Sequence, residues 1–239
     1  MSNFWDDVLP SNYYDKNLKI GLRKNRGIQS NWHNLTFLKV RSQISKSNKH
    51  LDYACGPGSF IGLYLKNNSI GVDVSKNQID FAINKYHEQG QFIELSDFDF
   101  KNYKKYFDSI SVIGLFEYLD DTESIELLEK FNYILKDNGV ILITTPNYSL
   151  IMRILEYIMH KIGTVDYSTE HKNKHNALTV NKLLSESSYE YEIKKILNLG
   201  IFFSIINLNF GQIINDFIEK ITFNKFGFLF FIKITKSNK

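Results

Sequence analysis

The chain has 239 residues, of which 43% are hydrophobic and 15% are aromatic, enough to bury a substantial core and too many for a disordered protein. The formal net charge is only +3 and the lysines are scattered among acidic residues, so a nucleic-acid-binding surface is not indicated. A single cysteine excludes an internal disulfide and a zinc site built from several thiolates.

The sequence carries no targeting or membrane signal that we can identify. The amino-terminal residues lack a basic segment followed by an apolar one, so no secretion signal is expected. No run of about 18 uncharged apolar residues occurs, so no membrane-spanning helix is expected. We therefore expect a cytoplasmic protein, and its length fits one domain.

Residues 1–46 are expected to be helical, because Phe37, Val40 and Ile44 recur at helical spacing. Short apolar strands then alternate with helices as far as Pro146, which indicates a parallel sheet covered on both faces. The expected strands are 51–54, 70–74, 92–95, 109–114 and 140–145. The expected helices are 59–66, one that begins at Lys76 with Ser75 and Gln78 as its cap, and one that Asp121 and Thr122 can cap and that Gly139 stops.

The pattern changes after Pro146. The expected elements there are an amphipathic helix over 148–160, a polar loop over 162–178, a short helix from Thr179, and strands at 189–197 and 228–234. Between the two late strands, the aromatic stretch Ile201–Phe223 is predicted to be helical and to pack on the core. Contact of this stretch with an acceptor pocket or with a bilayer surface stays open.

The most informative segment is Leu51–Phe60, where an apolar strand with one carboxylate leads into Gly56-Pro-Gly58. Glycines let the backbone approach a ligand closely and open the amino terminus of a helix. A second short strand ends in Asp73, which is placed for the hydroxyls of a ribose. A strand, a glycine turn, a helix and a strand that ends in a carboxylate together predict a nucleotide-type site.

The position of Asp52 discriminates between two ligands. Its carboxylate lies close before Gly56, where it would repel the pyrophosphate of a dinucleotide. S-adenosylmethionine instead brings an ammonium and a sulfonium, which Asp52 would attract directly or through water. The third glycine of the dinucleotide pattern is also missing, since Ile61 occupies its position. S-adenosylmethionine is therefore favoured over NAD, and an NAD-dependent oxidoreductase remains the less favoured alternative.

The segment Asp52-Tyr-Ala-Cys-Gly-Pro-Gly58 resembles motif I of the class I S-adenosylmethionine-dependent methyltransferases. Gly71-Val-Asp-Val-Ser75 is similar to their second motif, and the resemblance continues through the third, fourth and fifth strands. It implies that S-adenosylmethionine is the methyl donor. It also implies cofactor contacts by Asp52, Cys55, Gly56, Gly58, Asp73, Val74, Asp97, Phe98, Gly114 and Leu115.

Individual roles follow from the same resemblance. Asp73 would bind the ribose, Asp97 would meet the adenine amino group, and Phe98 would flank the adenine ring. Cys55 is expected to act through its main chain rather than as a reactive thiol. A member of the family that binds the cofactor without catalysis stays an alternative to an enzyme.

The resemblance implies a doubly wound, Rossmann-like α/β fold whose seven-stranded sheet has an antiparallel last strand. The chain 1–239 would form a single methyltransferase domain. Its expected parts are a helical cap (1–46), a cofactor-binding core (47–147), a lid and acceptor region (148–188), and the final strands with a helical excursion (189–239).

Candidate catalytic residues follow the fourth strand. The ubiquinone-biosynthesis O-methyltransferases, small-molecule enzymes that this chain resembles, have Glu-His there, whereas this chain has Glu117-Tyr118. His175, a few residues before Thr179, is a second candidate for the base that deprotonates a substrate hydroxyl. Otherwise His171 and His175 are solvated loop histidines, and no metal site is expected.

The acceptor is expected to be a small molecule or a glycan, methylated on oxygen or nitrogen. No nucleic-acid surface or added recognition domain is visible, and the Asn/Asp-Pro-Pro-Tyr/Phe signature of amino-directed methyltransferases is absent after the fourth strand. Tyr13, Tyr14 and Trp32 are candidates for a place near the methionine end of the cofactor. Alternatively, these rings only hold the helical cap together. The oligomeric state is not indicated.

Overall fold

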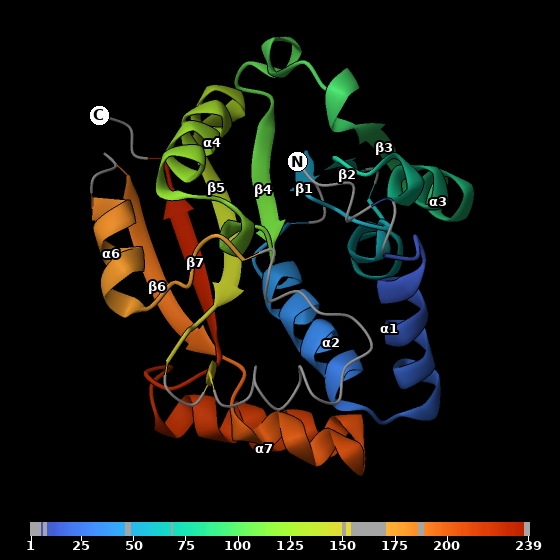
Figure 1. The fold of residues 1–239 in the computed structure, drawn as a ribbon, viewed down its shortest axis with the longest axis vertical. Helices are drawn as coiled ribbons and strands as arrows, with labels where there is room; N and C mark the ends of the chain where they lie inside the picture. The colour runs from blue at the N-terminus through green and yellow to red at the C-terminus, as the bar shows by residue number, and fades with distance from the viewer. Residues whose placement is uncertain are drawn as a thin grey trace.

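The computed structural model describes residue 6 and residues 9–45, 49–67, 69–149, 152–153, 171–185 and 189–236. Its centre is a seven-stranded sheet with strand order β3-β2-β1-β4-β5-β7-β6 (Figure 1). The strands are β1 (His50–Tyr53), β2 (Ser69–Asp73), β3 (Gly90–Glu94), β4 (Phe107–Ile113), β5 (Leu135–Pro146), β6 (Glu190–Ile196) and β7 (Leu229–Thr235). Strand β7 runs antiparallel to β5 and β6, and the other pairings are parallel. The predicted Rossmann-like fold is confirmed.

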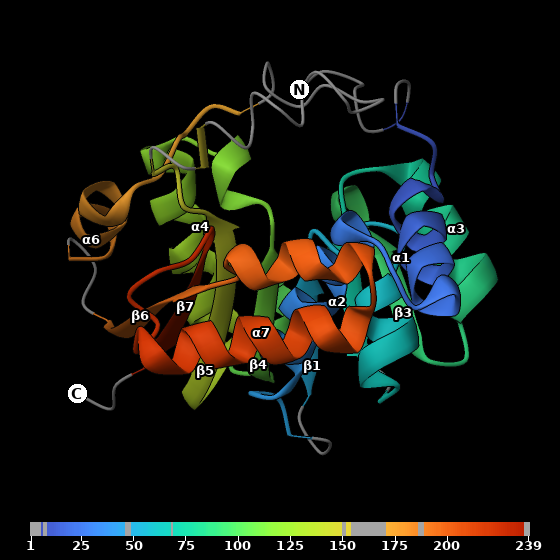
Figure 2. The ribbon, with the colours of Figure 1, turned by 90° about the horizontal axis from the view of Figure 1, so that it is seen from below.

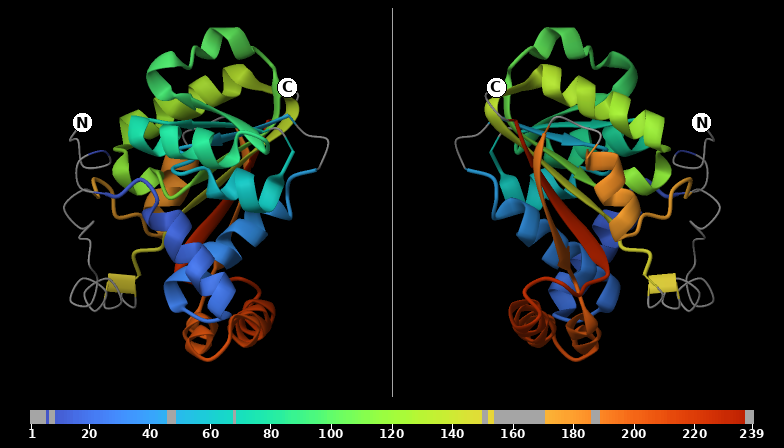
Figure 3. Two further views of the ribbon diagram at one scale, coloured as in Figure 1. Left: turned by 90° about the vertical axis from the view of Figure 1, so that its right-hand side faces the viewer. Right: turned by 90° about the vertical axis from the view of Figure 1, so that its left-hand side faces the viewer.

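Helices and short helical turns connect these strands. The longer helices are α1 (Tyr13–Lys24), α2 (Ile28–Arg41), α3 (Lys76–Tyr86), α4 (Asp121–Ile134), α6 (Ala177–Ser185) and α7 (Leu208–Ile221). The shorter turns are η2 (Ile61–Leu65), η3 (Leu95–Asp97), η4 (Phe100–Tyr103), η5 (Phe116–Tyr118) and η6 (Leu199–Ile205). The predicted helical stretch 201–223 thus forms η6 and α7, which lie side by side beyond the ends of the strands (Figures 2 and 3).

Two apolar clusters hold the layers together, as expected for a sheet covered on both faces. One cluster joins the sheet to α4 and α6, with Phe131 and Leu184 fully or almost fully buried. The other joins the sheet to α2, η2 and α3, with Val40, Ile61 and Ala82 at 0% exposure. Helix α2 therefore packs on the same face of the sheet as η2 and α3, and α1 packs against α2.

The predicted boundaries of the helix before β5 are wrong at both ends. Asp120 caps α4, because its carboxylate accepts a hydrogen bond from Glu123 N at 2.8 Å while the Glu123 carboxylate accepts one from Asp120 N at 2.8 Å. The helix ends at Ile134, well before Gly139. Leu135 already pairs with β4, so sheet pairing ends the helix earlier than the glycine predicts.

Two other caps refine the predictions. Ser75 Oγ accepts a hydrogen bond from Gln78 N at 3.3 Å, as predicted, but Gln78 Oε1 is buried without a partner among the described residues. Helix α6 begins at Ala177 rather than at Thr179, because the Asn176 carboxamide oxygen accepts hydrogen bonds from the two amides that follow Ala177.

Some predictions fall on residues that the structure does not describe. The expected helix over 148–160 and the loop over 162–178 lie largely outside the described ranges. The division into cap, core, lid and final strands stays a prediction. Across the described part of the chain, no helix combines the length and the apolar character needed to cross a membrane.

Candidate cofactor and acceptor site

The turn after β1 has an unusual backbone. The φ angle is +60° at Ala54, +53° at Gly56 and +72° at Gly58, all in the left-handed region. A Cβ added at Gly58 would lie 2.6 Å from the ring of Phe92 and 2.9 Å from Ala82 Cβ. Gly58 is therefore required by its backbone angle and by the close packing of α3 and β3 beneath the turn.

Asp73 ties this turn to the loop that follows β2. Its Oδ2 accepts a hydrogen bond from Gly56 N at 2.8 Å, and its Oδ1 accepts one from Ser75 N at 2.9 Å. Burial raises the pKa of Asp73, although these backbone donors oppose the shift. The carboxylate thus lies beside the glycine turn, at the position predicted for ribose binding.

A buried polar chain lies beneath the same turn. Ser111 Oγ donates a hydrogen bond to Asp52 Oδ1 at 2.5 Å and lies 3.0 Å from His50 Nε2, while His50 Nδ1 lies 2.8 Å from Ser109 Oγ. Burial lowers the pKa of His50 to about 3 and raises the pKa of Asp52 to about 7. His50 is therefore neutral and offers Asp52 no cation, so a negative charge on Asp52 is stabilised best by a positively charged ligand.

A cavity of about 610 Å³ opens at the carboxyl ends of β1, β2 and β4, the edge where α/β sheets bind ligands. This volume lies within the usual range for small-molecule sites. Its strand-side wall includes Asp52, Cys55, Gly56, Asp73 and Val74. Gly114 and Leu115 also line the cavity, so the structure brings seven of the predicted cofactor residues together there, whereas Gly58 packs on α3 and β3 beneath the turn and is not in the cavity wall.

The surroundings of Gln78 and Gly56 indicate whether this wall suits S-adenosylmethionine. Gln78 lines the cavity, and its Oε1 is buried with no hydrogen-bond partner among the described residues. A Cβ added at Gly56 would lie 3.0 Å from that oxygen, so the glycine leaves space beside it. An unpaired buried acceptor calls for a donor, and S-adenosylmethionine supplies hydroxyl and ammonium donors. The residues present fit this cofactor.

Cys55 also lies in the wall, but its thiol is not activated. The side chain is 8% exposed, and burial together with the nearby carboxylates raises the pKa of the thiol well above its usual value. Its amide donates a hydrogen bond to Val72 O at 3.0 Å, which holds the turn against β2.

The predicted adenine residues lie elsewhere. Asp97 is exposed on η3, and Phe98 is 5% exposed and stacks on Tyr103 with ring centroids 4.8 Å apart. Neither residue lines the cavity, whereas Leu95, at the start of η3, does. The short turn η3 directs Phe98 into the core, so the structure does not bring this predicted pair to the site.

The loop after β4 supplies the next part of the wall, with Gly114, Leu115, Glu117 and Tyr118. Glu117 is 5% exposed, and its Oε2 accepts a hydrogen bond from Thr145 Oγ1 at 3.1 Å. Burial raises the pKa of Glu117 to about 7. At neutral pH this carboxyl group can therefore both hold and release a proton.

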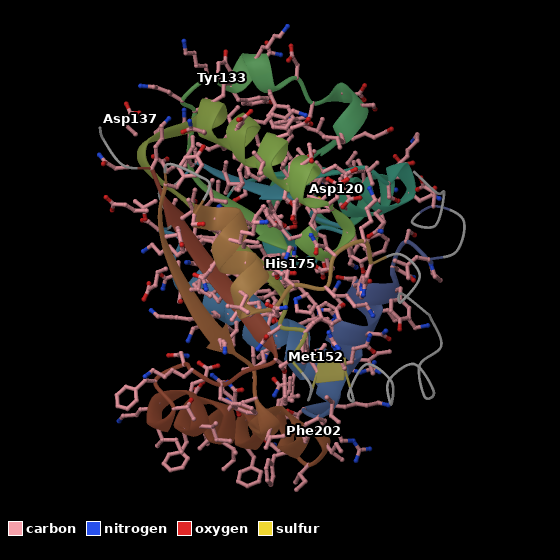
Figure 4. The ribbon with its side chains drawn as sticks, turned by 60° about the vertical axis from the view of Figure 1, so that its left-hand side comes forward. Asp120, Tyr133, Asp137, Met152, His175 and Phe202 are labelled. Carbon is pink, nitrogen blue, oxygen red and sulfur yellow. The ribbon has the colours of Figure 1, made fainter. Side chains whose placement is uncertain are left out.

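His175 does not reach the cavity. It is 1% exposed, and its Nε2 lies 3.4 Å from Phe116 O in η5 (His175 is labelled in Figure 4). Burial lowers its pKa. The expectation of a solvated loop histidine is therefore wrong, and the structure does not bring His175, the predicted catalytic residue, to the cavity wall. His171 also lies beside the loop after β4, with Nδ1 2.7 Å from Tyr148 OH and its ring centroid 5.0 Å from that of Tyr118.

The opposite wall comes from α1 and α2, with Tyr14, Trp32, His33 and Phe37. The Trp32 ring stacks on Phe228 at 6.5 Å with an interplanar angle of 9°. Tyr14 and Trp32 were predicted as candidates, and both line the cavity. His33 and Phe37 were not predicted as site residues, although their spacing of one helical turn places them on the same side of α2.

His33 is the titratable group of this helix-side wall. Its ring packs edge-on against Tyr14 with centroids 5.6 Å apart. Burial lowers the pKa of His33 to about 4, so the imidazole is neutral near pH 7. A neutral imidazole can donate or accept a hydrogen bond from a ligand in the cavity.

Residues 26–192 match a family model described as a methyltransferase domain. The match covers more than half of the chain and includes the strands whose ends form the cavity. The chain belongs to the class I S-adenosylmethionine-dependent methyltransferases. The predicted family is therefore confirmed for this methyltransferase, and S-adenosylmethionine is its cofactor.

Individual relatives are more distant. An uncharacterised protein of Rickettsia prowazekii is 29% identical over 149 residues, which are 57% of this chain and 56% of that protein. The chain spans about half the length of the curated relatives it matches.

Solved structures share the fold at low identity. An S-adenosylmethionine-dependent methyltransferase from Archaeoglobus fulgidus is 24% identical, with a TM-score of 0.58 over 85% of this chain and 94% of that one. The magnesium protoporphyrin IX methyltransferase of Synechocystis PCC 6803, solved with bound S-adenosylhomocysteine, is 14% identical, with a TM-score of 0.62 over 97% of each chain.

Proposed function

We propose that this methyltransferase transfers the methyl group of S-adenosylmethionine to an oxygen or nitrogen of a small-molecule or glycan acceptor. The observation that carries the proposal is the pair of buried carboxylates, Asp52 and Asp73, on either side of the glycine turn. Two carboxylates favour a cationic ligand and oppose a pyrophosphate. This argues against the NAD-dependent alternative.

The strand-side wall is assigned to the cofactor. Asp73 would bind the ribose hydroxyls, and Asp52 would attract the ammonium directly or through water. Cys55 and Gly56 would contribute main-chain contacts, and Gln78 Oε1 would accept a hydrogen bond from the ligand. When bound, S-adenosylmethionine supplies a methyl group that its sulfonium has already made electrophilic.

The helix-side wall is assigned to the acceptor. Tyr14, Trp32 and Phe37 present rings to the cavity, and such rings can hold an apolar ring or the apolar face of a sugar. Their main task would be to align the acceptor atom and to exclude water. Positioning of this kind accounts for much of the rate enhancement that a methyl transfer requires.

Glu117 is the proposed proton acceptor when the acceptor atom belongs to a hydroxyl group. It lines the cavity and its pKa is raised to about 7, which suits general-base catalysis near neutral pH. Tyr118 would contact the cofactor or the acceptor beside it. His175 is not retained as a candidate base, since it lies outside the cavity wall.

Calorimetric titration separates the candidate ligands. We expect S-adenosylhomocysteine to bind and NAD to bind far more weakly. Asp73→Ala should weaken S-adenosylhomocysteine binding by about 2 kcal/mol, roughly 30-fold, because it removes charge-assisted hydrogen bonds. Asp80→Ala is the matched control, since Asp80 is an exposed carboxylate on α3 that pairs only with Lys76 among the contacts described.

Two results would contradict the proposal in different ways. Binding of NAD without binding of S-adenosylhomocysteine would overturn the cofactor assignment. Cofactor binding without transfer of a labelled methyl group to any fraction of a small-molecule extract would favour the non-catalytic alternative.

A further inference from the structure

The outer surface of η6 and α7 is apolar. Six residues, which we call the η6–α7 face, are each between 55% and 82% exposed: Ile205, Ile206, Ile213, Phe217, Ile221 and Phe223. Figure 4 places Phe202 in this layer and shows ring-bearing side chains that project from it, away from the sheet. Monomeric proteins rarely expose so many large apolar side chains together, so this face calls for a ligand.

Helix α7 exposes a stripe of large apolar side chains and buries two polar ones. Its exposed residues Ile213, Phe217 and Ile221 recur every four positions, which places them on one stripe. Its buried residues are Leu208, Gly211, Asn215 and Glu219, so two of the four carry polar side chains. An ordinary surface helix buries its apolar stripe, so the orientation of α7 leaves the apolar stripe for an external partner.

Hydrogen bonds and an ion pair fix this orientation. Asn198 Nδ2 donates to Asn215 O at 2.9 Å, Asn215 Nδ2 donates to Glu219 Oε1 at 3.0 Å, and Lys39 Nζ pairs with Glu219 Oε2 at 3.0 Å. A rotation of α7 that buried its apolar stripe would leave these buried polar groups without partners. The apolar exposure is therefore built into the fold.

Cations border the η6–α7 face. Lys220 and Lys225 are exposed on α7 and just after it. The last residues of α1 and the turn that follows add Arg23, Lys24 and Arg26, all exposed. That turn is joined to the face by two backbone hydrogen bonds, from Gly27 N to Ser204 O at 2.7 Å and from Leu208 N to Asn25 O at 3.0 Å. Between residues 199 and 225, Asp216 is the exposed acid, since Glu219 is buried.

We propose that the η6–α7 face docks on the surface of an anionic phospholipid bilayer. The apolar stripe would enter the boundary between headgroups and acyl chains, and the bordering cations would contact lipid phosphates. A helix of 14 residues is about 21 Å long, which suits a helix that lies in the plane of the surface. A second copy of the chain fits less well, because pairing of two such faces would bring their cations together.

Docking would place the cavity close to the bilayer. Asn31 and Trp32 are neighbours on α2: Asn31 Nδ2 donates to Ser204 Oγ in η6 at 2.5 Å, and Trp32 lines the cavity. The docking proposal does not rest on the proposed function, since it concerns a surface on the other side of α2.

Flotation with lipid vesicles tests the proposal on the full chain. We expect the protein to float with vesicles of phosphatidylcholine and phosphatidylglycerol, and to bind vesicles of phosphatidylcholine alone more weakly. The double substitution Ile213→Asn/Phe217→Asn should reduce binding about tenfold or more, because it replaces two of the apolar side chains that would enter the bilayer. Lys220→Glu/Lys225→Glu should reduce binding to the anionic vesicles only.

Leu178→Asn is the matched control, because Leu178 is 82% exposed but lies on α6. Its binding to vesicles should equal that of the unsubstituted chain, and all variants should retain their affinity for S-adenosylhomocysteine, which reports folding. Failure of the unsubstituted chain to float with anionic vesicles would overturn the proposal. So would an equal loss in the Leu178 variant, or light scattering that shows a dimer dissolved by Ile213→Asn/Phe217→Asn without vesicle binding.

Discussion

The two walls of the cavity are built in different ways. The strand-side wall consists of a glycine turn, backbone amides and the carboxylates of Asp52 and Asp73, all near the ends of β1 and β2. The helix-side wall consists mainly of rings from α1 and α2, including Trp32 and Phe37. The first wall depends on a few short segments, whereas the second depends on how the helices dock on the sheet. Under the proposed function, the first wall recognises the cofactor and the second selects the acceptor.

The largest expected effect concerns the charge in the strand-side wall. Because the pKa of Asp52 is raised to about 7 in the folded state and is about 3.9 when unfolded, the folded state retains a proton that the unfolded state loses. The stability that the retained proton on Asp52 contributes is complete below pH 4 and is lost as the pH rises to about 7. Asp52→Asn removes the buried charge and should raise the free energy of unfolding by up to about 4 kcal/mol at pH 8.

Urea unfolding at several pH values measures this effect. The difference between the Asn variant and the unsubstituted chain should widen from pH 4 to pH 7 and stay constant above it. The same substitution should weaken S-adenosylhomocysteine binding. An Asn variant that is less stable at pH 8 would show that Asp52 serves the fold rather than the ligand.

The second prediction compares two glycines with almost the same backbone angle. Gly58→Ala should lower the free energy of unfolding by about 3 kcal/mol, because the new Cβ would clash with Phe92 and Ala82. Gly114→Ala, at φ +70°, should cost about 1 kcal/mol, since the nearest atom to its Cβ would be Glu117 Oε1 at 3.5 Å. The free energies of unfolding come from thermal or urea unfolding. Equal losses in the two variants would mean that the contacts of Gly58 with Phe92 and Ala82 do not affect stability.

The third prediction concerns Glu117, which lies where the two walls meet. If it accepts the proton of the acceptor, Glu117→Gln should lower kcat about 100-fold and leave S-adenosylhomocysteine affinity nearly unchanged. In the unsubstituted enzyme, kcat/KM should rise with pH through about 7, because the ionised carboxylate is the active form. Persistence of this rise in the Gln variant would assign the titration to another group.

The smallest expected effect concerns the helix-side wall. His33→Leu keeps most of the bulk but removes the ring nitrogens, so the KM for the acceptor should rise about fivefold, equivalent to one lost hydrogen bond. Calorimetric affinity for S-adenosylhomocysteine should not change. A loss of cofactor affinity instead would show that the two walls do not divide their ligands as we propose.

The same contrast explains which parts of the site were predictable. Asp52, Gly56 and Asp73 could be placed from the sequence, because the ends of adjacent parallel strands meet at one edge. Asp97 and Phe98 follow β3 in the same manner, but the turn η3 sends Phe98 into the core. A strand end predicts where the backbone goes and not where the next side chains point.

The helix-side wall could not be predicted in this way. Its position depends on contacts between residues far apart in the sequence, such as the hydrogen bond from Asn31 to Ser204, which are 173 positions apart. His33 looked like part of a cap helix, and nothing local marks it as a cavity residue. The fold itself was easier to predict, because alternation of apolar strands and helices is a repeated, local signal.

The connection between β6 and β7 has a consequence for how this protein can change. Ile196 and Leu229 are paired neighbours in the sheet, so residues 197–228 leave the sheet and return to the same point. Antiparallel neighbours can be joined by a two-residue turn, and the sheet therefore does not need this long excursion. The segment that carries η6 and α7 could therefore be replaced by another segment without a change in the register of any strand. Under the docking proposal, such a replacement would change which surface the enzyme binds.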